Sequence, residues 1–318
     1  MIYLFKNFNL FLQLSTFIFR SFIRTVIACN YFTSSKIRIN REYSIFMLFY
    51  YVNSSLNQSF RLLLQPIFET MTKFTIEEQV LRRIDRRFSK GVVQYGLIEE
   101  GDKILIGLSG GKDSLALVEL LGRRARIFKP RFSVVAVHVV MKNIPYQSDL
   151  MYLRSHAEAF GIPLVVYETS FDPSTDTRKS PCFLCSWNRR KALFTVAKEL
   201  GCNKIALGHH MDDILETLLM NITYQGAFST MPPRLVMKKF DMTIIRPMCL
   251  VHESDLLELA ELHQYQKQMK NCPYESQSSR SDMKGVLHQL EGMNPEARYS
   301  LWGSMTNIQE ELLPDKIE

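Results

Sequence analysis

The sequence predicts an α/β fold, a doubly wound parallel sheet of five strands with helical additions at both ends. Two observations predict it. Between about residues 103 and 247, short β-branched runs alternate with runs of helical period. The first strand run, KILIGL at 103–108, leads through a glycine-containing loop into the helical run LALVELLG at 115–122. Such alternation is typical of a parallel sheet covered by helices on both faces.

Each predicted element follows from its local pattern. Thr75 and Glu78 form a capping box that begins an amphipathic helix over 75–89. The first core helix begins near Ser114, and Gly122 is expected to end it. Asn294-Pro295 marks the start of one of the last helices. The predicted strands are 103–109, 132–140, 163–168, 204–209 and 243–247, and the other predicted helices are 148–160, 186–200 and 213–223.

The loop Ser109–Ser114, SGGKDS, has the composition of a phosphate-binding turn. A strand, a glycine turn and a helix together direct backbone N–H groups and a helix N-terminus at an anion. Gly110 and Gly111 let the backbone approach phosphates closely. Lys112 supplies a positive charge, the two serines supply hydroxyls, and Asp113 can hold Mg²⁺. The spacing differs from that of a Walker A loop.

A second motif, GHHMDDILET at 208–217, joins the fourth predicted strand to its helix. Asp213 and Glu216 satisfy a capping box, which leaves Asp212 and the two adjacent histidines unexplained. An aspartate here could steer Mg²⁺ or accept a proton, and a histidine could contact phosphate.

The cysteines predict metal or sulfur chemistry rather than a disulfide framework. Cys182 and Cys185 form a C-x-x-C pair before Arg189-Arg190, and Cys272 follows the fifth strand. A helix N-terminus and nearby arginines favour the thiolate form. Three thiolates could hold three irons of a [4Fe–4S] cluster or a catalytic zinc, or they could relay sulfur without metal. The residues leave these alternatives open, together with inert buried thiols. We expect Cys202 and Cys249 to be core residues.

Charge is unevenly placed along the 318 residues, whose net charge is +7. Residues 1–70 are apolar and poor in acids, and no stretch reaches membrane-spanning length. We expect them to be an extension outside the fold, with the domain at 71–318. They resemble a transit peptide, but the abrupt change of composition at Met71 favours a translation start there. A cluster of arginines in the first helix is expected to be a solvated face rather than an RNA contact; its members are Arg82, Arg83, Arg86 and Arg87.

SGGKDS, C-x-x-C-x-x-x-R-R, GHH-x-DD-x-x-ET and one distant cysteine, in this order, resemble the TtcA family of the PP-loop ATP-pyrophosphatases. The resemblance covers about residues 75–310. It implies the strand order 3-2-1-4-5, which brings both loop motifs to one crevice. It also implies ATP, Mg²⁺ held by Asp113, and a [4Fe–4S] cluster held by Cys182, Cys185 and Cys272. The sequence departs from the family where Glu275 replaces the second cysteine of a distal C-x-x-C.

The family's activity implies an ATP-dependent tRNA sulfurtransferase. A base carbonyl of tRNA, expected to be that of an anticodon-loop cytidine, would be adenylated with release of pyrophosphate, and sulfur would replace its oxygen to give 2-thiocytidine. The expected catalytic residues are Cys182, Cys185, Asp212, Asp213 and Lys112. The expected cofactor-binding residues are Ser109, Gly110, Gly111, Lys112, Asp113, Ser114, His138, Gly208, His209, Arg189 and Arg190.

The implied partners are tRNA and a sulfur donor such as a cysteine desulfurase, with a homodimer as a further possibility, no membrane contact and a cytoplasmic location. Two alternatives use the same motifs. One is an amidating or lysidine-type tRNA ligase of the PP-loop class without a cluster. The other is a non-catalytic RNA-binding protein that holds metal and nucleotide.

Overall fold

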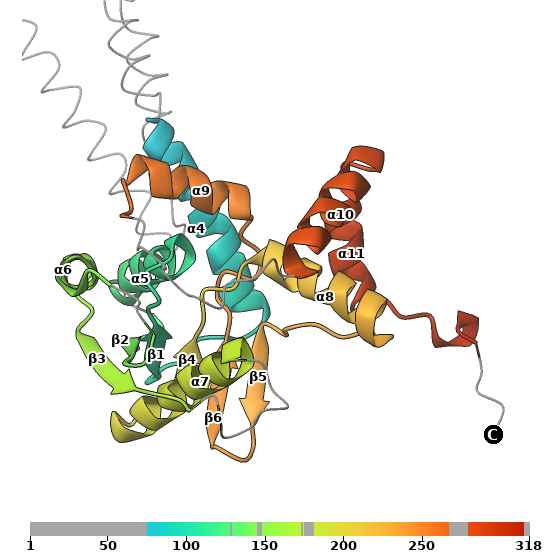
Figure 1. Cartoon of the computed structure of the whole chain (residues 1–318). Coiled ribbons are helices and arrows are strands. Elements are labelled where there is room, and N and C mark those ends of the chain that lie inside the picture. Colours follow the sequence, from blue (N-terminus) through green and yellow to red (C-terminus); the bar gives the residue numbers. More distant parts are fainter. Residues whose placement is uncertain are drawn as a thin grey trace, which may run out of the picture. The chain divides into compact units, whose positions relative to one another are not determined.

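A central sheet organises the molecule (Figure 1). The computed structural model describes residues 75–127, 129–144, 148–172, 174, 181–266 and 279–314. Within these residues the sheet has six strands in the order β3-β2-β1-β4-β6-β5. The strands are β1 Lys103–Gly107, β2 Ser133–Met141, β3 Leu164–Thr169, β4 Lys204–Ala206, β5 Arg234–Met237 and β6 Met242–Ile245.

The predicted doubly wound sheet and its strand order are confirmed, with one correction. The five predicted strands correspond to β1, β2, β3, β4 and β6, and these five pair with one another in parallel. The sequence prediction missed β5, which adds a sixth, antiparallel strand at the edge next to β6. Its run RLVM, together with KKFD and MTII, is a hairpin pattern, and Asp241 in the turn has a positive φ of 48°. The whole sheet is therefore mixed rather than purely parallel.

The helices begin and end close to the predicted positions, with two corrections. The capping box of Thr75 and Glu78 is present, with hydrogen bonds of 2.9 and 3.1 Å. Gly122 does not end its helix but lies inside it. The helix with the cysteines begins before Cys182 rather than at 186. The helices are α4 Ile76–Gln94, α5 Lys112–Ala125, α6 Leu150–Ala159, α7 Pro181–Glu199, α8 Met211–Gln225, α9 Glu253–Leu262, α10 Ser279–Met293 and α11 Ala297–Ser304, followed by the short 3₁₀ helix η2 Glu310–Leu312.

Alternating side chains of the strands point to two separate cores. Ile104 and Ile106 of β1 belong to a large buried cluster shared with α4, α5, α6 and α9. Leu105, between them, faces the opposite side and packs with Val196 and Ala197 of α7. This two-sided burial explains why β1 reads as an uninterrupted apolar run.

A third group of helices packs beside the sheet. Helices α8, α10 and α11 lie together on the right of Figure 1, where Met211, Leu215 and Leu287 form their buried centre. Among the described residues, no helix is long and apolar enough to cross a membrane.

The arginine cluster of α4 is not the plain solvated face that the sequence suggested. Arg83 forms ion pairs with Asp255 and Glu258 of α9, and Arg87 also pairs with Asp255. Asp255 is buried, so these pairs fasten α4 to α9. Arg86 and Arg82 remain exposed, as expected.

Candidate active site

A cavity of about 340 Å³ lies at the carboxyl ends of β1, β2 and β4, where the two loop motifs meet. This is the switch point of the sheet, because the chain continues to β2 on one side of β1 and to β4 on the other. The predicted site residues that line the cavity are Ser109, Gly111, Asp113, Ser114, His138, Arg189, Gly208, His209 and Asp213. Gly110, Lys112, Arg190, Asp212, Cys182 and Cys185 are not part of this lining.

The loop Ser109–Ser114, called the glycine loop from here on, is held by its own serines. Gly110 has a positive φ of 83°, which a residue with a side chain adopts only with strain. The Ser114 hydroxyl donates to the Gly111 carbonyl over 2.9 Å and accepts the N–H of Gly110 over 3.1 Å. Gly111 is the N-cap of α5 and makes no side-chain cap. The helix therefore begins with its positive end at the cavity, which suits a phosphate.

Gly208 brings the second motif directly against the glycine loop. A Cβ atom at Gly208 would lie 3.1 Å from the carbonyl carbon and oxygen of Asp113 and 3.3 Å from the nitrogen of Ser114. These are backbone atoms and cannot rotate away. A side chain at Gly208 would therefore force the start of α5 to shift by a few tenths of an ångström.

Asp113 has the features of a magnesium ligand. Its Oδ1 atom is buried and accepts no hydrogen bond from the residues that the structure describes. The same atom lies 3.1 Å from the ammonium nitrogen of Lys112. Asp113 also lines the cavity, and a carboxylate there is the kind of ligand that Mg²⁺ prefers.

His138 lines the cavity as a neutral donor. It is 1% exposed, and burial lowers its pKa below the ordinary histidine value. Its Nδ1 lies 2.7 Å from the carbonyl oxygen of Leu108, so we assign the proton to Nδ1, since a carbonyl only accepts. Nε2 then accepts from the Ser148 hydroxyl over 2.7 Å. His138 thus holds the end of β1 in place beside the glycine loop.

The capping box of α8 differs from the predicted one. His210, not Asp213, is the N-cap, and Asp213 is the partner three residues on. The His210 N–H donates to the Asp213 carboxylate over 3.1 Å, and the Asp213 N–H donates to His210 Nδ1 over 3.4 Å. Asp213 combines this capping role with a place in the cavity lining.

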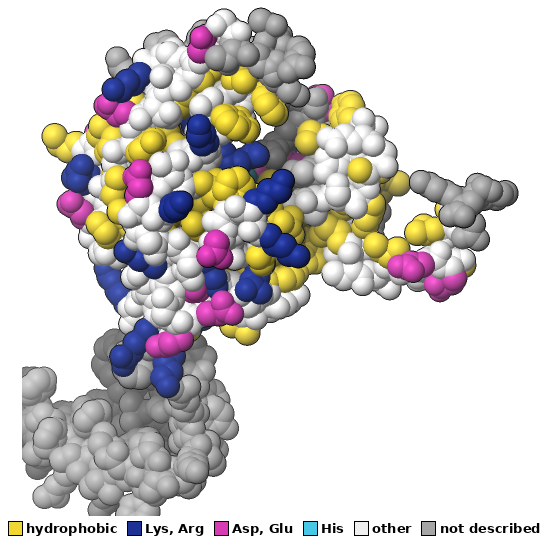
Figure 2. Space-filling view, turned by 90° about the horizontal axis from the view of Figure 1, so that it is seen from below, with side chains coloured by type: hydrophobic (Ala, Val, Ile, Leu, Met, Phe, Trp, Pro, Cys, Tyr) yellow, Lys and Arg dark blue, Asp and Glu magenta, His cyan; other side chains and the backbone are white. Residues whose placement is uncertain are grey.

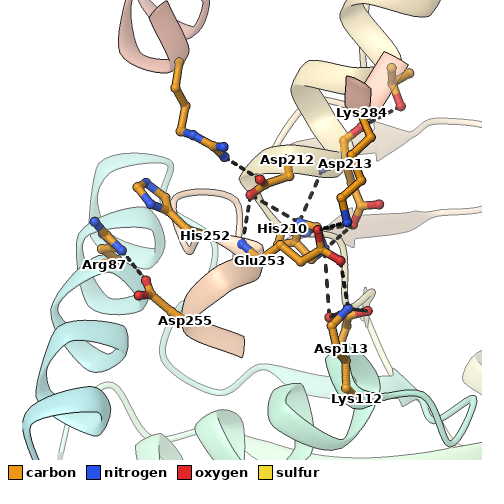
Figure 3. Close-up of polar contacts among 12 residues, drawn as sticks. Arg87, Lys112, Asp113, His210, Asp212, Asp213, His252, Glu253, Asp255 and Lys284 are labelled. Carbon is orange, nitrogen blue, oxygen red and sulfur yellow. Dashed lines mark hydrogen bonds and ion pairs between the residues drawn. The ribbon is translucent and has the colours of Figure 1, made fainter. Parts of the chain in front are cut away.

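Asp212 faces away from the cavity lining and joins three helices (Figure 3). Its carboxylate accepts the N–H of Glu253 over 2.9 Å and a hydrogen bond from Arg298. Burial raises the pKa of Asp212, but the hydrogen bond and charge of Arg298 outweigh it and leave that pKa below its ordinary value. Asp212 is therefore an ionised anchor in this structure, not a group exposed to the cavity.

Arg246 at the end of β6 was not among the predicted site residues. Its Nε donates to Nδ1 of His209 over 3.2 Å, and its Nη1 donates to the carbonyl of Pro232 over 2.6 Å. The buried guanidinium thus orients a histidine that lines the cavity. In the sequence, Arg246 directly follows an apolar strand, and a charged residue is unusual at such a buried position.

The C-x-x-C pair lies in the first turn of α7. Cys182 is exposed, and Cys185 is half-buried against the cluster of Met141, Ile144 and Phe171. Arg189, one turn further on, lines the cavity. Two thiols at a helix N-terminus beside an arginine are donors that suit iron or zinc. Cys202 and Cys249 are buried, as predicted.

The third predicted ligand, Cys272, lies outside the described residues, as does Glu275. Within the described ranges, no group of three His, Cys, Asp or Glu side chains is placed to hold a metal ion. The assignment of Cys182, Cys185 and Cys272 as cluster ligands therefore stays a prediction.

Comparison with known proteins identifies the family. The model of the PP-loop domain matches residues 76–281. The tRNA-cytidine(32) 2-sulfurtransferase of Syntrophotalea carbinolica is 37% identical over 244 residues, which cover 76% of this chain and 94% of the relative. The enzyme of the same name from Geotalea daltonii is 33% identical over 246 residues, covering 76% and 97%. The chain belongs to the tRNA-cytidine(32) 2-sulfurtransferases of the PP-loop family.

A solved structure is similar over the same region. The U34-tRNA thiolase NcsA from Methanococcus maripaludis, solved with its [4Fe–4S] cluster, has a TM-score of 0.60 and 25% identity and covers 75% of this chain and 82% of its own. The resemblance to sulfurtransferases drawn from the motifs is thus confirmed. It favours a sulfurtransferase over the ligase and the non-catalytic alternative, and the fold is that of PP-loop enzymes.

Proposed function

We propose that this sulfurtransferase uses ATP to convert a cytidine in the anticodon loop of tRNA, position 32 by the names of its relatives, into 2-thiocytidine. One observation carries the proposal. A single helix, α7, bears the C-x-x-C pair in its first turn and, one turn later, a residue that lines the cavity beside the glycine loop. This arrangement supports adjacent sites for ATP activation and sulfur delivery.

The first step is adenylation of the base. The carbonyl oxygen of the base attacks the α-phosphorus of ATP, an O–P bond forms, and the bond to pyrophosphate breaks. The glycine loop and the N-terminus of α5 bind the departing phosphates, and Lys112 and Arg189 stabilise the charge that builds on them. Asp113 would hold Mg²⁺, which supplies further positive charge against the phosphates.

Sulfur then replaces the oxygen. Sulfide attacks the base carbon that bears the adenylated oxygen, and a carbon–sulfur bond forms. The carbon–oxygen bond breaks, and AMP leaves with the former carbonyl oxygen. Cys182 and Cys185, with Cys272 as the proposed third ligand, would hold a [4Fe–4S] cluster, as NcsA has one. When bound, the cluster supplies an iron with an open coordination position for a sulfur ligand. The geometry favours Asp213 over Asp212 for contact with substrate, because only Asp213 lines the cavity.

The proposed partners follow from this chemistry. An unpaired loop nucleotide is the form of tRNA that can enter a cavity. A cysteine desulfurase is the proposed sulfur donor, with a dithiol reductant that releases sulfide from its persulfide and becomes a disulfide. A homodimer is the proposed assembly. Thiolate ligands require a reducing compartment, for which we propose the cytoplasm. Residues 71–318 are the proposed domain, with residues 1–70 as an extension outside it.

Replacing Cys185 tests the proposal, because it removes a cluster ligand without touching the ATP cavity. We expect the Cys185→Ala variant of the full chain to bind ATP normally but to produce no 2-thiocytidine in cells that lack their own enzyme. Mass spectrometry of tRNA nucleosides measures this. Cys202→Ala is the matched control, since it removes a buried core thiol and should keep full thiolation. Full thiolation and full iron content in Cys185→Ala would contradict the proposal.

A further inference from the structure

Glu253, the first residue of α9, bridges the glycine loop and the C-terminal helices (Figure 3). Its Oε1 lies 3.2 Å from the ammonium nitrogen of Lys112. Its Oε2 lies 2.6 Å from the ammonium nitrogen of Lys284 on α10. The Glu253 side chain is 18% exposed, whereas that of Lys284 is 46% exposed, so the glutamate is the shielded member of the Lys284 pair. Glu253 lies outside the sequence motifs of the site.

Lys112 has two competing carboxylate partners. Its ammonium nitrogen lies 3.1 Å from Asp113 Oδ1 and 3.2 Å from Glu253 Oε1. Asp113 is also the carboxylate best placed for Mg²⁺. A metal ion and an ammonium cannot share one carboxylate oxygen without electrostatic cost, since both are positive. Lys112 therefore needs a second anion when Asp113 binds the metal.

We propose that Glu253 is a positioning residue for the ATP-dependent step, which holds the ammonium of Lys112 beside the phosphate cavity and thereby leaves Asp113 to Mg²⁺. The inference rests on the proposed function, because it assigns Lys112 and Asp113 to ATP and its metal. Lys112 stands between Gly111 and Asp113, which both line the cavity.

The surroundings of Glu253 suit this role because they hold its carboxylate in one orientation. Its N–H donates to Asp212 over 2.9 Å, which fixes the start of α9. Lys284 holds the second oxygen and opposes rotation of the carboxylate. Burial raises the pKa of Glu253, but Lys284 and Lys112 outweigh burial and lower that pKa, so the carboxylate stays charged.

A control residue lies on the same helix. Glu258 pairs with Arg83 of α4 and has no contact with the glycine loop in the described part of the chain. Glu258→Gln removes the same charge from the same helix, away from the cavity.

The test compares Glu253→Gln with Glu258→Gln in the full chain. Equilibrium binding of MgATP is measured by calorimetry without tRNA, at several Mg²⁺ concentrations. We expect Glu253→Gln to bind MgATP about tenfold more weakly, the effect of one charge-assisted hydrogen bond. Its Mg²⁺ requirement should rise, because Lys112 then remains on Asp113. Glu258→Gln should bind as the wild type does.

Equal or tighter binding of MgATP by Glu253→Gln would overturn the inference, since Glu253 would then merely compete with phosphate for Lys112. If Glu253→Gln does not fold, Lys284→Met takes its place. That change frees the carboxylate without removing it and should weaken MgATP binding by about threefold; unchanged binding would overturn the inference. A wild type that binds MgATP but does not thiolate tRNA would contradict the proposed function and leave this inference standing.

Discussion

A single glycine sets how closely the two motifs of the site approach each other. In Gly208→Ala, the new methyl group would meet backbone atoms of Asp113 and Ser114 at 3.1 to 3.3 Å. Because those atoms begin α5, the strain displaces the glycine loop. We expect weaker MgATP binding and a loss of about 1–3 kcal/mol in the free energy of unfolding. Calorimetry and denaturant unfolding measure the two effects.

Gly285 of α10 is the matched control for that change. A Cβ at Gly285 meets no atom within 4 Å, and the residue is exposed on a helix. Gly285→Ala should therefore leave MgATP binding unchanged and raise stability by up to about 1 kcal/mol. If Gly208→Ala binds MgATP as tightly as Gly285→Ala, the close approach at Gly208 has no bearing on the site.

Asp212 and Asp213 show how adjacent residues acquire different roles. Successive residues of a helix point about 100° apart. At the start of α8, Asp213 therefore lines the cavity, whereas Asp212 points toward α9 and α11. The sequence predicted an acidic residue at the crevice, and the direction of the helix decides which one lies there.

Helix α7 has two chemically different faces. Arg189 and Leu193 line the cavity, whereas Trp187, Arg190 and Lys191 are exposed. Trp187 is 49% exposed, and the ammonium of Lys191 lies 5.7 Å from the centre of its ring. Figure 2 looks at the molecule from below and shows lysine and arginine side chains interleaved with hydrophobic ones. An aromatic ring beside cations suits an unpaired nucleotide.

Trp187→Ala tests whether the outer face of α7 contacts tRNA. We expect the variant to bind tRNA about tenfold more weakly, because one base would lose its stacking partner, while MgATP binding stays unchanged. Filter binding at fixed salt measures the first and calorimetry the second.

The sequence has 2 tryptophans, which allows a direct optical check. Trp302 is half-buried, and its indole N–H donates to the Tyr95 hydroxyl over 3.1 Å. In a Trp302→Phe background, tRNA should quench the fluorescence of Trp187. No quenching, together with unchanged tRNA affinity of Trp187→Ala, would show that tRNA docks elsewhere.

At the level of the whole molecule, the ion pairs of one arginine fasten α8, α10 and α11 to one another. Arg298 of α11 pairs with Asp212 of α8 and with Glu291 of α10. The Asp212 and Arg298 side chains are 10% and 9% exposed. In Arg298→Met, the Asp212 carboxylate would remain buried without its partner, so we expect a loss of about 3 kcal/mol in the free energy of unfolding at neutral pH.

The pH dependence of that loss identifies Asp212 as its source. In the wild type the pKa of Asp212 is lowered, so its contribution to stability is present above about pH 4 and is lost as pH falls through the folded-state pKa. In Arg298→Met, burial acts without the opposing charge of Arg298 and raises the pKa of Asp212. Protonation of Asp212 at acid pH then removes the free-energy cost of its buried charge. Urea unfolding from pH 8 down to about pH 4 should show the two proteins converging. If the difference in unfolding free energy between the two proteins did not change with pH, the loss would come from the broken pair with Glu291 instead.

The local sequence was sufficient to predict most of the sheet, because each buried parallel strand is a continuous apolar run between punctuating residues. The capping box of Thr75 and the turn of Ser109–Ser114 depend on neighbours within a few residues, so they were visible in the sequence too. The short edge strand β5 was not visible in the sequence, because four residues with one exposed face carry little apolar signal. Gly122 was wrongly predicted to end its helix. Glycine is needed there because Phe160, 38 residues further along the chain, packs closely against it.

Motif order in the sequence established the family and the chemistry of the loop, the C-x-x-C pair and the strand-four turn. Tertiary structure decided which of these side chains meet. Glu253 and Arg298 come from segments far along the chain, and no local pattern marks them, because their significance is the charge they face after folding. Arg246 follows an apolar strand, but only the fold shows that it orients His209. The assignment of Asp213 to the cavity and Asp212 to Arg298 has the same cause: a side chain's partner depends on the direction in which the folded backbone points it.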